Sequence, residues 1–125
     1  MPRPRLLVVD DEEHVRFALV RWFEACGFDV DVAFDGQDAV TKCAENEYDV
    51  ITMDLVMPRM DGATAIRAIR ELSPTVPIVV LSGYPERLVP LSGPGPTRTF
   101  AKPMMLRDLE REIRALLDPP ATVKA

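Results

Sequence analysis

Short apolar runs alternate along this chain with stretches in which apolar residues recur every three or four positions. The runs favour strands, and they cover residues 5–10, 28–33, 49–54, 78–82 and 97–101. The stretches between them favour amphipathic helices, and the first carries apolar residues at a 3.6-residue spacing: Val15, Ala18, Leu19, Trp22, Phe23 and Cys26. Strands that alternate with helices predict an α/β fold with a parallel sheet, because parallel strands need long crossover connections.

The expected ends of the helices carry residues that start or stop a helix. Asp11 or Glu12 is placed to cap the first helix, and Gly27 ends it. Asp35-Gly36 opens the second helix, and Asp61-Gly62 opens the third. We expect one face of the third helix to turn inward with Ala65, Ile66, Ile69 and Leu72, and one face of the second with Ala39, Val40, Cys43 and Ala44.

The predicted strands differ in their pattern of apolar and polar side chains. Residues 28–33 alternate apolar and acidic side chains, which indicates a half-exposed strand at an edge of the sheet. Three other strands are continuous apolar runs, as expected where helices cover both faces of a sheet. The segment 84–96 holds four prolines and two glycines, so the fourth helix is expected to be shortened or distorted.

Length and composition limit the number of domains and the class of protein. With 125 residues, 47% of them apolar, the chain suits one domain, which we place at 1–118 with a tail or linker start at 119–125. It has no apolar run of about 18 residues and no signal-peptide core, so we expect a cytoplasmic protein that does not enter a membrane. The net charge of −5 disfavours direct nucleic-acid binding, and Cys26 and Cys43 are expected to be free and buried.

Polar residues follow the apolar strands at one predicted end of the sheet. They are Asp10, Asp11, Asp54, Ser82 and Lys102. Functional crevices of such sheets lie outside the carboxyl ends of the strands. Three carboxylates there would repel one another, by roughly 3 kcal/mol for two charges about 5 Å apart at an effective dielectric near 20. Mg²⁺ would relieve this repulsion, and a carboxylate beside it could attack phosphorus, so we predict an aspartyl-phosphate site with Asp54 as nucleophile.

These motifs, in this order, resemble the receiver domain of two-component response regulators over residues 5–117. The resemblance rests on Asp10-Asp11, Asp54 with Met57-Pro58 behind it, Ser82-Gly83 and Lys102-Pro103. It implies a doubly wound, flavodoxin-like sheet of five parallel strands in the order 2-1-3-4-5. Receivers attached to hybrid histidine kinases are one type with a shortened fourth helix.

The resemblance also implies a role for each residue. Asp54 would accept the phosphoryl group from a histidine kinase or a phosphotransfer protein. Asp10, Asp11, Asp54 and the backbone carbonyl of Val56 would bind Mg²⁺. Ser82 would hydrogen-bond the phosphoryl group, and Lys102 would pair with its oxygens. Such a domain catalyses only its own phosphoryl transfer and dephosphorylation, and it signals by conformational change or by binding a partner, either a second copy or a downstream effector domain.

Two departures from the family pattern affect the expected signal output and the expected lifetime of the phosphoryl group. Thr99 stands where the family usually has a switch aromatic, which weakens the expected conformational output. Val56 and Tyr84 would crowd the approach of the hydrolytic water, which predicts a phosphoryl group that decays slowly. A constitutive interaction module with weakened phosphorylation-dependent output is therefore the alternative function. A phosphohydrolase is disfavoured, because Val56 cannot protonate a leaving group.

Overall fold

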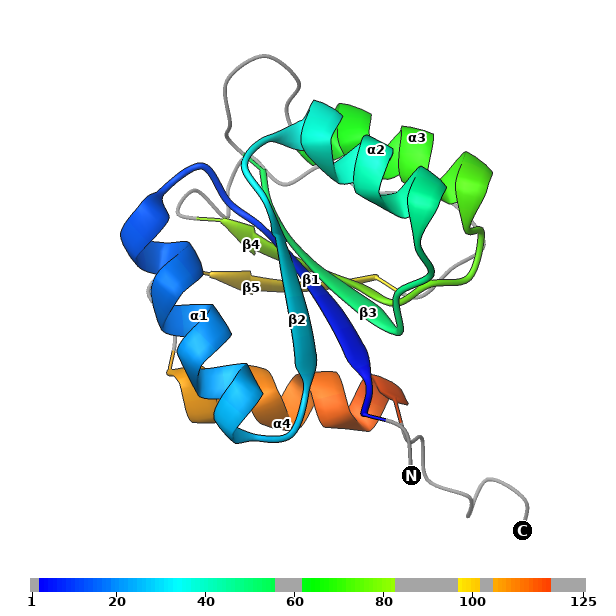
Figure 1. The fold of residues 1–125 in the computed structure, drawn as a ribbon. Coiled ribbons are helices and arrows are strands. Elements are labelled where there is room, and N and C mark those ends of the chain that lie inside the picture. Colours follow the sequence, from blue (N-terminus) through cyan, green and yellow to red (C-terminus); the bar gives the residue numbers. More distant parts are fainter. Residues whose placement is uncertain (1–2, 56–61, 83–96, 102–104, 118–125) are drawn as a thin grey trace, which may run out of the picture.

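The computed structural model describes residues 3–55, 62–82, 97–101 and 105–117, and of residues 82 and 97–101 it describes the backbone. Strands and helices alternate through most of this part of the chain (Figure 1). In chain order they are β1 (Arg5–Val9), α1 (Glu13–Ala25), β2 (Asp29–Ala33), α2 (Gly36–Glu45), β3 (Val50–Asp54), α3 (Gly62–Leu72), β4 (Ile78–Ser82), β5 (Thr97–Ala101) and α4 (Leu106–Leu117). No helix among the described residues is long and apolar enough to cross a membrane.

The strands form one sheet in the order β2-β1-β3-β4-β5, and every neighbouring pair is parallel. The predicted α/β fold with a parallel sheet is therefore confirmed. The acidic, alternating strand β2 lies at an edge, as its pattern indicated. The fourth helix predicted between β4 and β5 falls on residues outside the described part of the chain.

Helices cover both faces of the sheet, α1 and α4 on one side and α2 and α3 on the other (Figure 1). Alternate residues of each central strand point to opposite faces. Leu6 and Val8 of β1 belong to the core beneath α1 and α4, which is completed by Leu19, Phe23, Phe28, Val50, Val79, Leu81, Leu109 and Ile113. Leu7 and Val9 belong to the core beneath α2 and α3, with Ala33, Ala39, Ile51, Met53, Ala65, Ile66, Ile69, Val76, Ile78 and Val80. This burial is why the central strands read as unbroken apolar runs.

Several helix ends follow the predicted signals. The Asp35 side chain accepts a hydrogen bond from the N–H of Asp38, 2.8 Å away, and so caps α2. Gly27 follows α1 with a φ of 98°, a left-handed conformation that favours glycine. Glu12 is the N-cap residue of α1 but makes no side-chain cap, so that helix begins without the predicted hydrogen bond.

Four residues that the sequence placed on apolar helix faces are exposed, and one of them is Ala18 of α1. Trp22 is 36% exposed because it sits at the border of the α1 stripe, where its indole N–H reaches the carboxylate of Glu110 on α4 at 3.2 Å. Leu72 is 49% exposed because α3 ends there, beyond the last turn that packs on the sheet. Ala44 is also exposed, since it lies beside the inward stripe of α2 rather than on it. Cys26 and Cys43 are free but only partly buried.

Two basic side chains bind carbonyl groups along the open edge of β2. Even-numbered residues of this strand point their backbone groups outward, because Asp29 and Ala33 bond to the β1 side. Lys42 Nζ donates to the outward carbonyl of Val32 at 2.6 Å, and Arg3 donates to the carbonyl of Phe28, directly before the strand, at 3.2 Å. Charged side chains therefore occupy one outward carbonyl of the edge strand and the carbonyl just before it.

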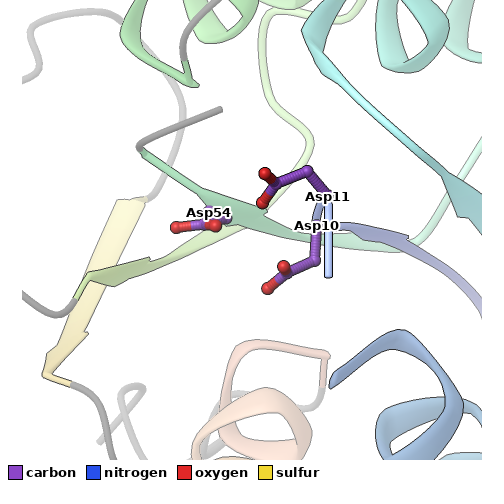
Figure 2. A group of neighbouring side chains, drawn as sticks. All are labelled: Asp10, Asp11 and Asp54. Atoms are coloured by element: carbon purple, nitrogen blue, oxygen red, sulfur yellow. The ribbon is translucent and has the colours of Figure 1, made fainter. Parts of the chain in front are cut away.

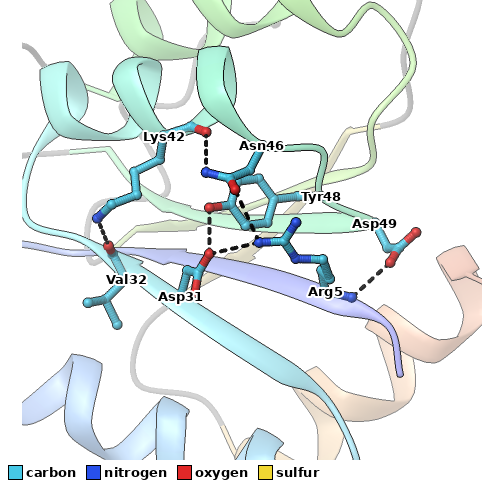
Figure 3. A network of polar contacts seen from close by, with 7 residues as sticks. All are labelled: Arg5, Asp31, Val32, Lys42, Asn46, Tyr48 and Asp49. Carbon is cyan, nitrogen blue, oxygen red and sulfur yellow. Dashed lines mark hydrogen bonds and ion pairs between the residues drawn. The ribbon is translucent and has the colours of Figure 1, made fainter. Parts of the chain in front are cut away.

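A polar network ties β2 to the start of the sheet (Figure 3). The Tyr48 hydroxyl donates to Asp31 at 2.7 Å, and the Arg5 guanidinium contacts the same Asp31 carboxylate atom at 3.2 Å. The Arg5 N–H donates to Asp49 at 2.8 Å, and its guanidinium lies 5.1 Å from the centre of the Tyr48 ring. Burial and the hydrogen bond to Asp31 raise the pKa of the Tyr48 hydroxyl well above its usual range.

Candidate functional site

Three carboxylates gather beyond the carboxyl ends of β1 and β3 (Figure 2). Asp10 and Asp11 come directly after β1, and Asp54 is the last residue of β3. β1 and β3 are parallel neighbours with Val9 opposite Met53, so the residues that follow Val9 arrive beside Asp54. One carboxylate oxygen from each aspartate lies within 4.8 Å of the others. The predicted grouping of these three acids is present, while their chemical roles stay predictions.

The three acids differ in their surroundings. Asp10 is 1% exposed and Asp54 7%, whereas Asp11 is open to solvent. The Oδ1 atom of Asp10 accepts a hydrogen bond from the N–H of Glu12 at 3.0 Å. A buried carboxylate needs such partners, because an uncompensated charge is costly inside a protein. The site thus has two buried acids, of which Asp10 is held by this hydrogen bond, and one acid at its solvent side.

This donor set suits a small, hard divalent cation. Mg²⁺ takes oxygen ligands at about 2.1 Å in an octahedron, which places neighbouring ligand oxygens about 3 Å apart and opposite ones about 4.2 Å apart. The observed spread of up to 4.8 Å requires only small side-chain movements to reach that geometry. Mg²⁺ also binds with several waters, which the exposed side at Asp11 can admit. The residues present therefore fit the metal that the sequence predicted.

Gly62 supports Asp54 from the neighbouring helix, and its packing was not predicted. The Gly62 N–H donates to the carbonyl of Leu55 at 2.9 Å, directly after the aspartate. A β-carbon at position 62 would overlap the main-chain oxygen of Asp54. The sequence signal was the Asp61-Gly62 pair, which indicated a helix start but not this close approach.

The remaining predicted site residues are only partly within the described chain. Ser82 is the last residue of β4, and its backbone pairs with Ala101 of β5. Asp54 pairs with Leu81, so the backbones of Ser82 and Ala101 end at the same side of the sheet as the acids. Val56 and Lys102 lie outside the described residues, as do Gly83 and Tyr84, and the side chains of Ser82 and Thr99 are not described.

The chain matches a family model described as the response regulator receiver domain over residues 6–114. Among curated proteins it is 37% identical over 117 residues to the transcriptional regulatory protein PrrA of Mycobacterium bovis. That alignment covers 91% of this chain and 50% of PrrA. The chain thus spans about half the length of the curated relatives it matches.

Solved structures give the same similarity in three dimensions. The receiver domain of the hybrid histidine kinase CckA is 30% identical, with a TM-score of 0.80, over 91% of this chain and 99% of that one. The receiver domain of the sensor histidine kinase PA1611 from Pseudomonas aeruginosa is 28% identical, with a TM-score of 0.76, over 93% and 98% of the two chains. The PA1611 structure has a magnesium ion coordinated in its active site cleft.

Proposed function

The chain belongs to the response regulator receiver domain family, and from that premise we propose that it is a phosphoacceptor switch with Asp54 as the acceptor. The donor is a phosphohistidine on a histidine kinase or a phosphotransfer protein. The observation that carries the proposal is the grouping of Asp10, Asp11 and Asp54, whose carboxylate oxygens lie within 4.8 Å of one another. A structural role alone would not bring two buried acids and a third acid to one point at the end of a sheet.

Mg²⁺ would be held by Asp10, Asp11 and Asp54, together with the backbone carbonyl of Val56. When bound, it supplies positive charge that offsets the repulsion between the carboxylates and the incoming phosphoryl oxygens. The magnesium ion in the PA1611 receiver supports this assignment by similarity.

Residues of the chain itself then carry out the phosphoryl transfer. A carboxylate oxygen of Asp54 attacks phosphorus, an O–P bond forms, and the N–P bond of the phosphohistidine breaks, with the electron pair returning to the imidazole nitrogen. The buried position of Asp54 at the strand end holds this oxygen in one direction, which favours an in-line approach. Lys102 pairs with the phosphoryl oxygens, and the Ser82 hydroxyl donates to one of them.

The phosphorylated domain passes the signal by conformational change or by binding a partner. The partner is an effector domain or a second copy of the chain. The similarity to PrrA, a transcriptional regulatory protein twice as long as the matched region, supports an effector domain as the output. The domain itself performs no other turnover chemistry.

The test is phosphorylation by a small-molecule phosphodonor with Mg²⁺, followed by intact mass over time. We expect the wild type to gain one phosphoryl group, and we expect no gain with Asp54→Asn or with excess chelator. Asp29→Asn is the matched control, because Asp29 is an exposed acid of β2 away from the site, and it should behave as the wild type. A folded wild type that gains no phosphoryl group, or that gains one equally with Asp54→Asn, would refute the proposal.

A further inference from the structure

Arg16 on α1 reaches back to the loop that carries two of the three acids. Its Nη1 atom donates to the main-chain oxygen of Asp10 at 2.7 Å. Helical side chains tilt toward the N-terminus of their helix, so a residue in the second turn can reach this loop. A bond of this length from a guanidinium is at the short, strong end of the range for charge-assisted hydrogen bonds.

The carbonyl that Arg16 holds belongs to the peptide unit between Asp10 and Asp11. Peptide units are planar, so fixing the direction of this oxygen fixes the direction in which the backbone continues to Asp11. The N–H of Asp10 is bound to the carbonyl of Ala33 at 3.2 Å, on the other side of the residue. Within the described chain the Asp11 carboxylate makes no hydrogen bond or ion pair of its own. Its position therefore depends on the backbone that Arg16 holds.

Phe34 gives the guanidinium of Arg16 a platform. The guanidinium carbon lies 4.6 Å from the centre of the Phe34 ring, although this ring is 52% exposed. The N–H of Phe34 donates to Asp38 at 3.1 Å, which fixes the platform to the start of α2. Arg16 forms no ion pair with any acid in the described residues, so its hydrogen bond is directed at the backbone.

We propose that Arg16 is a positioning residue of the acidic site: it holds the Asp10–Asp11 peptide, on the Phe34 platform, so that Asp11 faces the cation. This inference rests on the proposed function for the identity of the cation. Replacing Arg16 would have two effects on Mg²⁺ affinity, and they have opposite signs. Loss of the positive charge alone would tighten cation binding, whereas loss of the positioning would weaken it.

Calorimetric titration with Mg²⁺ separates the two effects. Arg16→Met keeps an unbranched stem but removes both donor and charge, and we expect about tenfold weaker binding, as for the loss of an outer-shell partner of a metal ligand. Arg16→Lys keeps a donor and the charge and should recover most of the affinity. Arg21→Met is the matched control, because it removes the same charge from α1 at a guanidinium that lies over Phe17 instead. We expect that control to bind Mg²⁺ at least as tightly as the wild type.

The amide resonance of Asp11 gives a second readout without metal. We expect it to shift or broaden in Arg16→Met and to stay in place in Arg21→Met. If Arg16→Met does not fold, Phe34→Leu tests the platform, and we expect it to weaken Mg²⁺ binding as well. Mg²⁺ affinity equal to or above that of the wild type in the folded Arg16→Met variant would overturn the inference. A wild type that binds no Mg²⁺ would instead count against the proposed function, and the metal-free Asp11 resonance would still test Arg16.

Discussion

Gly62, the first residue of α3, packs against the main-chain oxygen of Asp54 so closely that a β-carbon at position 62 would overlap it. The same β-carbon would lie 2.8 Å from the Cα of Leu55. Both neighbours are backbone atoms, which cannot turn aside as the end of a side chain can. The end of β3 and the start of α3 are therefore held together where the candidate phosphoacceptor leaves the sheet.

Replacing Gly62 with alanine should destabilise the protein, against the usual effect in a helix. Helix propensity alone favours alanine by about 1 kcal/mol. Forcing an extra carbon into a packed site costs about 1–3 kcal/mol, and here it also displaces the backbone of Asp54. We expect a lower free energy of unfolding in urea and slower phosphorylation. Glu71→Ala, at an exposed position of the same helix, should stay within about 0.5 kcal/mol of the wild type. A Gly62→Ala variant that is more stable than the wild type would show that the backbone yields.

The hydroxyl of Thr52 is a buried donor without a partner among the described residues. Thr52 is 1% exposed and lies between Val8 and Val79, two residues before Asp54 on the same strand. An unsatisfied buried hydroxyl carries a desolvation penalty, and valine has nearly the same shape without it. We expect Thr52→Val to raise the free energy of unfolding by about 1 kcal/mol. Thr52→Ser, which keeps the hydroxyl and loses the methyl group, should be less stable than the wild type. The reverse order of these two variants would contradict this account.

The acidic grouping was predictable from the sequence because it follows from topology. Asp10 and Asp54 each end an apolar strand, and parallel neighbours bring their carboxyl ends to one side of the sheet. The edge position of β2 was predictable for a similar reason, since Asp29 and Asp31 interrupt its apolar residues. These conclusions need only the order of the strands along the chain and the end or face of the sheet on which each residue lies.

Contacts between a side chain and the backbone of a distant segment could not be predicted in this way. Arg16 reads as an ordinary solvent-facing residue of an amphipathic helix, and nothing in its spacing points to the carbonyl of Asp10. Thr52 reads as a good strand former, and only the packing around it reveals an unpaired hydroxyl. Trp22 is apolar enough to suit the core or a partner surface, and only the rotation of α1 shows that it lies at the border of the stripe.

Mg²⁺ should stabilise the folded protein, because the three acids repel one another without it. At a concentration 100 times the dissociation constant, a ligand that binds only the folded state adds about 2.7 kcal/mol. We expect Mg²⁺ to raise the melting temperature, and NaCl of equal ionic strength to do so much less. Asp11→Asn should be slightly more stable than the wild type without metal and should gain less from Mg²⁺. Glu13→Gln, at an exposed acid nearby, should respond as the wild type; equal gains in all three proteins would place the metal elsewhere.

The Tyr48 hydroxyl should make the protein sensitive to alkaline pH. Its pKa is raised in the folded state by burial and by the hydrogen bond to Asp31. A tyrosine in the unfolded chain ionises near pH 10. The neutral Tyr48 hydroxyl therefore contributes fully to the free energy of unfolding below about pH 10, and this contribution is lost as the pH rises further. Tyr48→Phe should lose about 1 kcal/mol at neutral pH through the missing hydrogen bond, and its stability should fall less steeply above pH 10. Urea unfolding at several pH values measures both effects, and parallel pH curves for the two proteins would disprove the link.

Lys42 occupies a carbonyl group of β2 and Arg3 occupies the carbonyl group directly before this strand, which has a consequence for behaviour at high protein concentration. A strand from another molecule that aligned with this edge would have to displace both side chains. The edge also carries charged side chains of both signs, because Asp29 pairs with Arg3 and Asp31 pairs with Arg5. Growth of the sheet from one molecule into the next is therefore disfavoured at β2, which protects the protein from aggregation by strand addition at this edge.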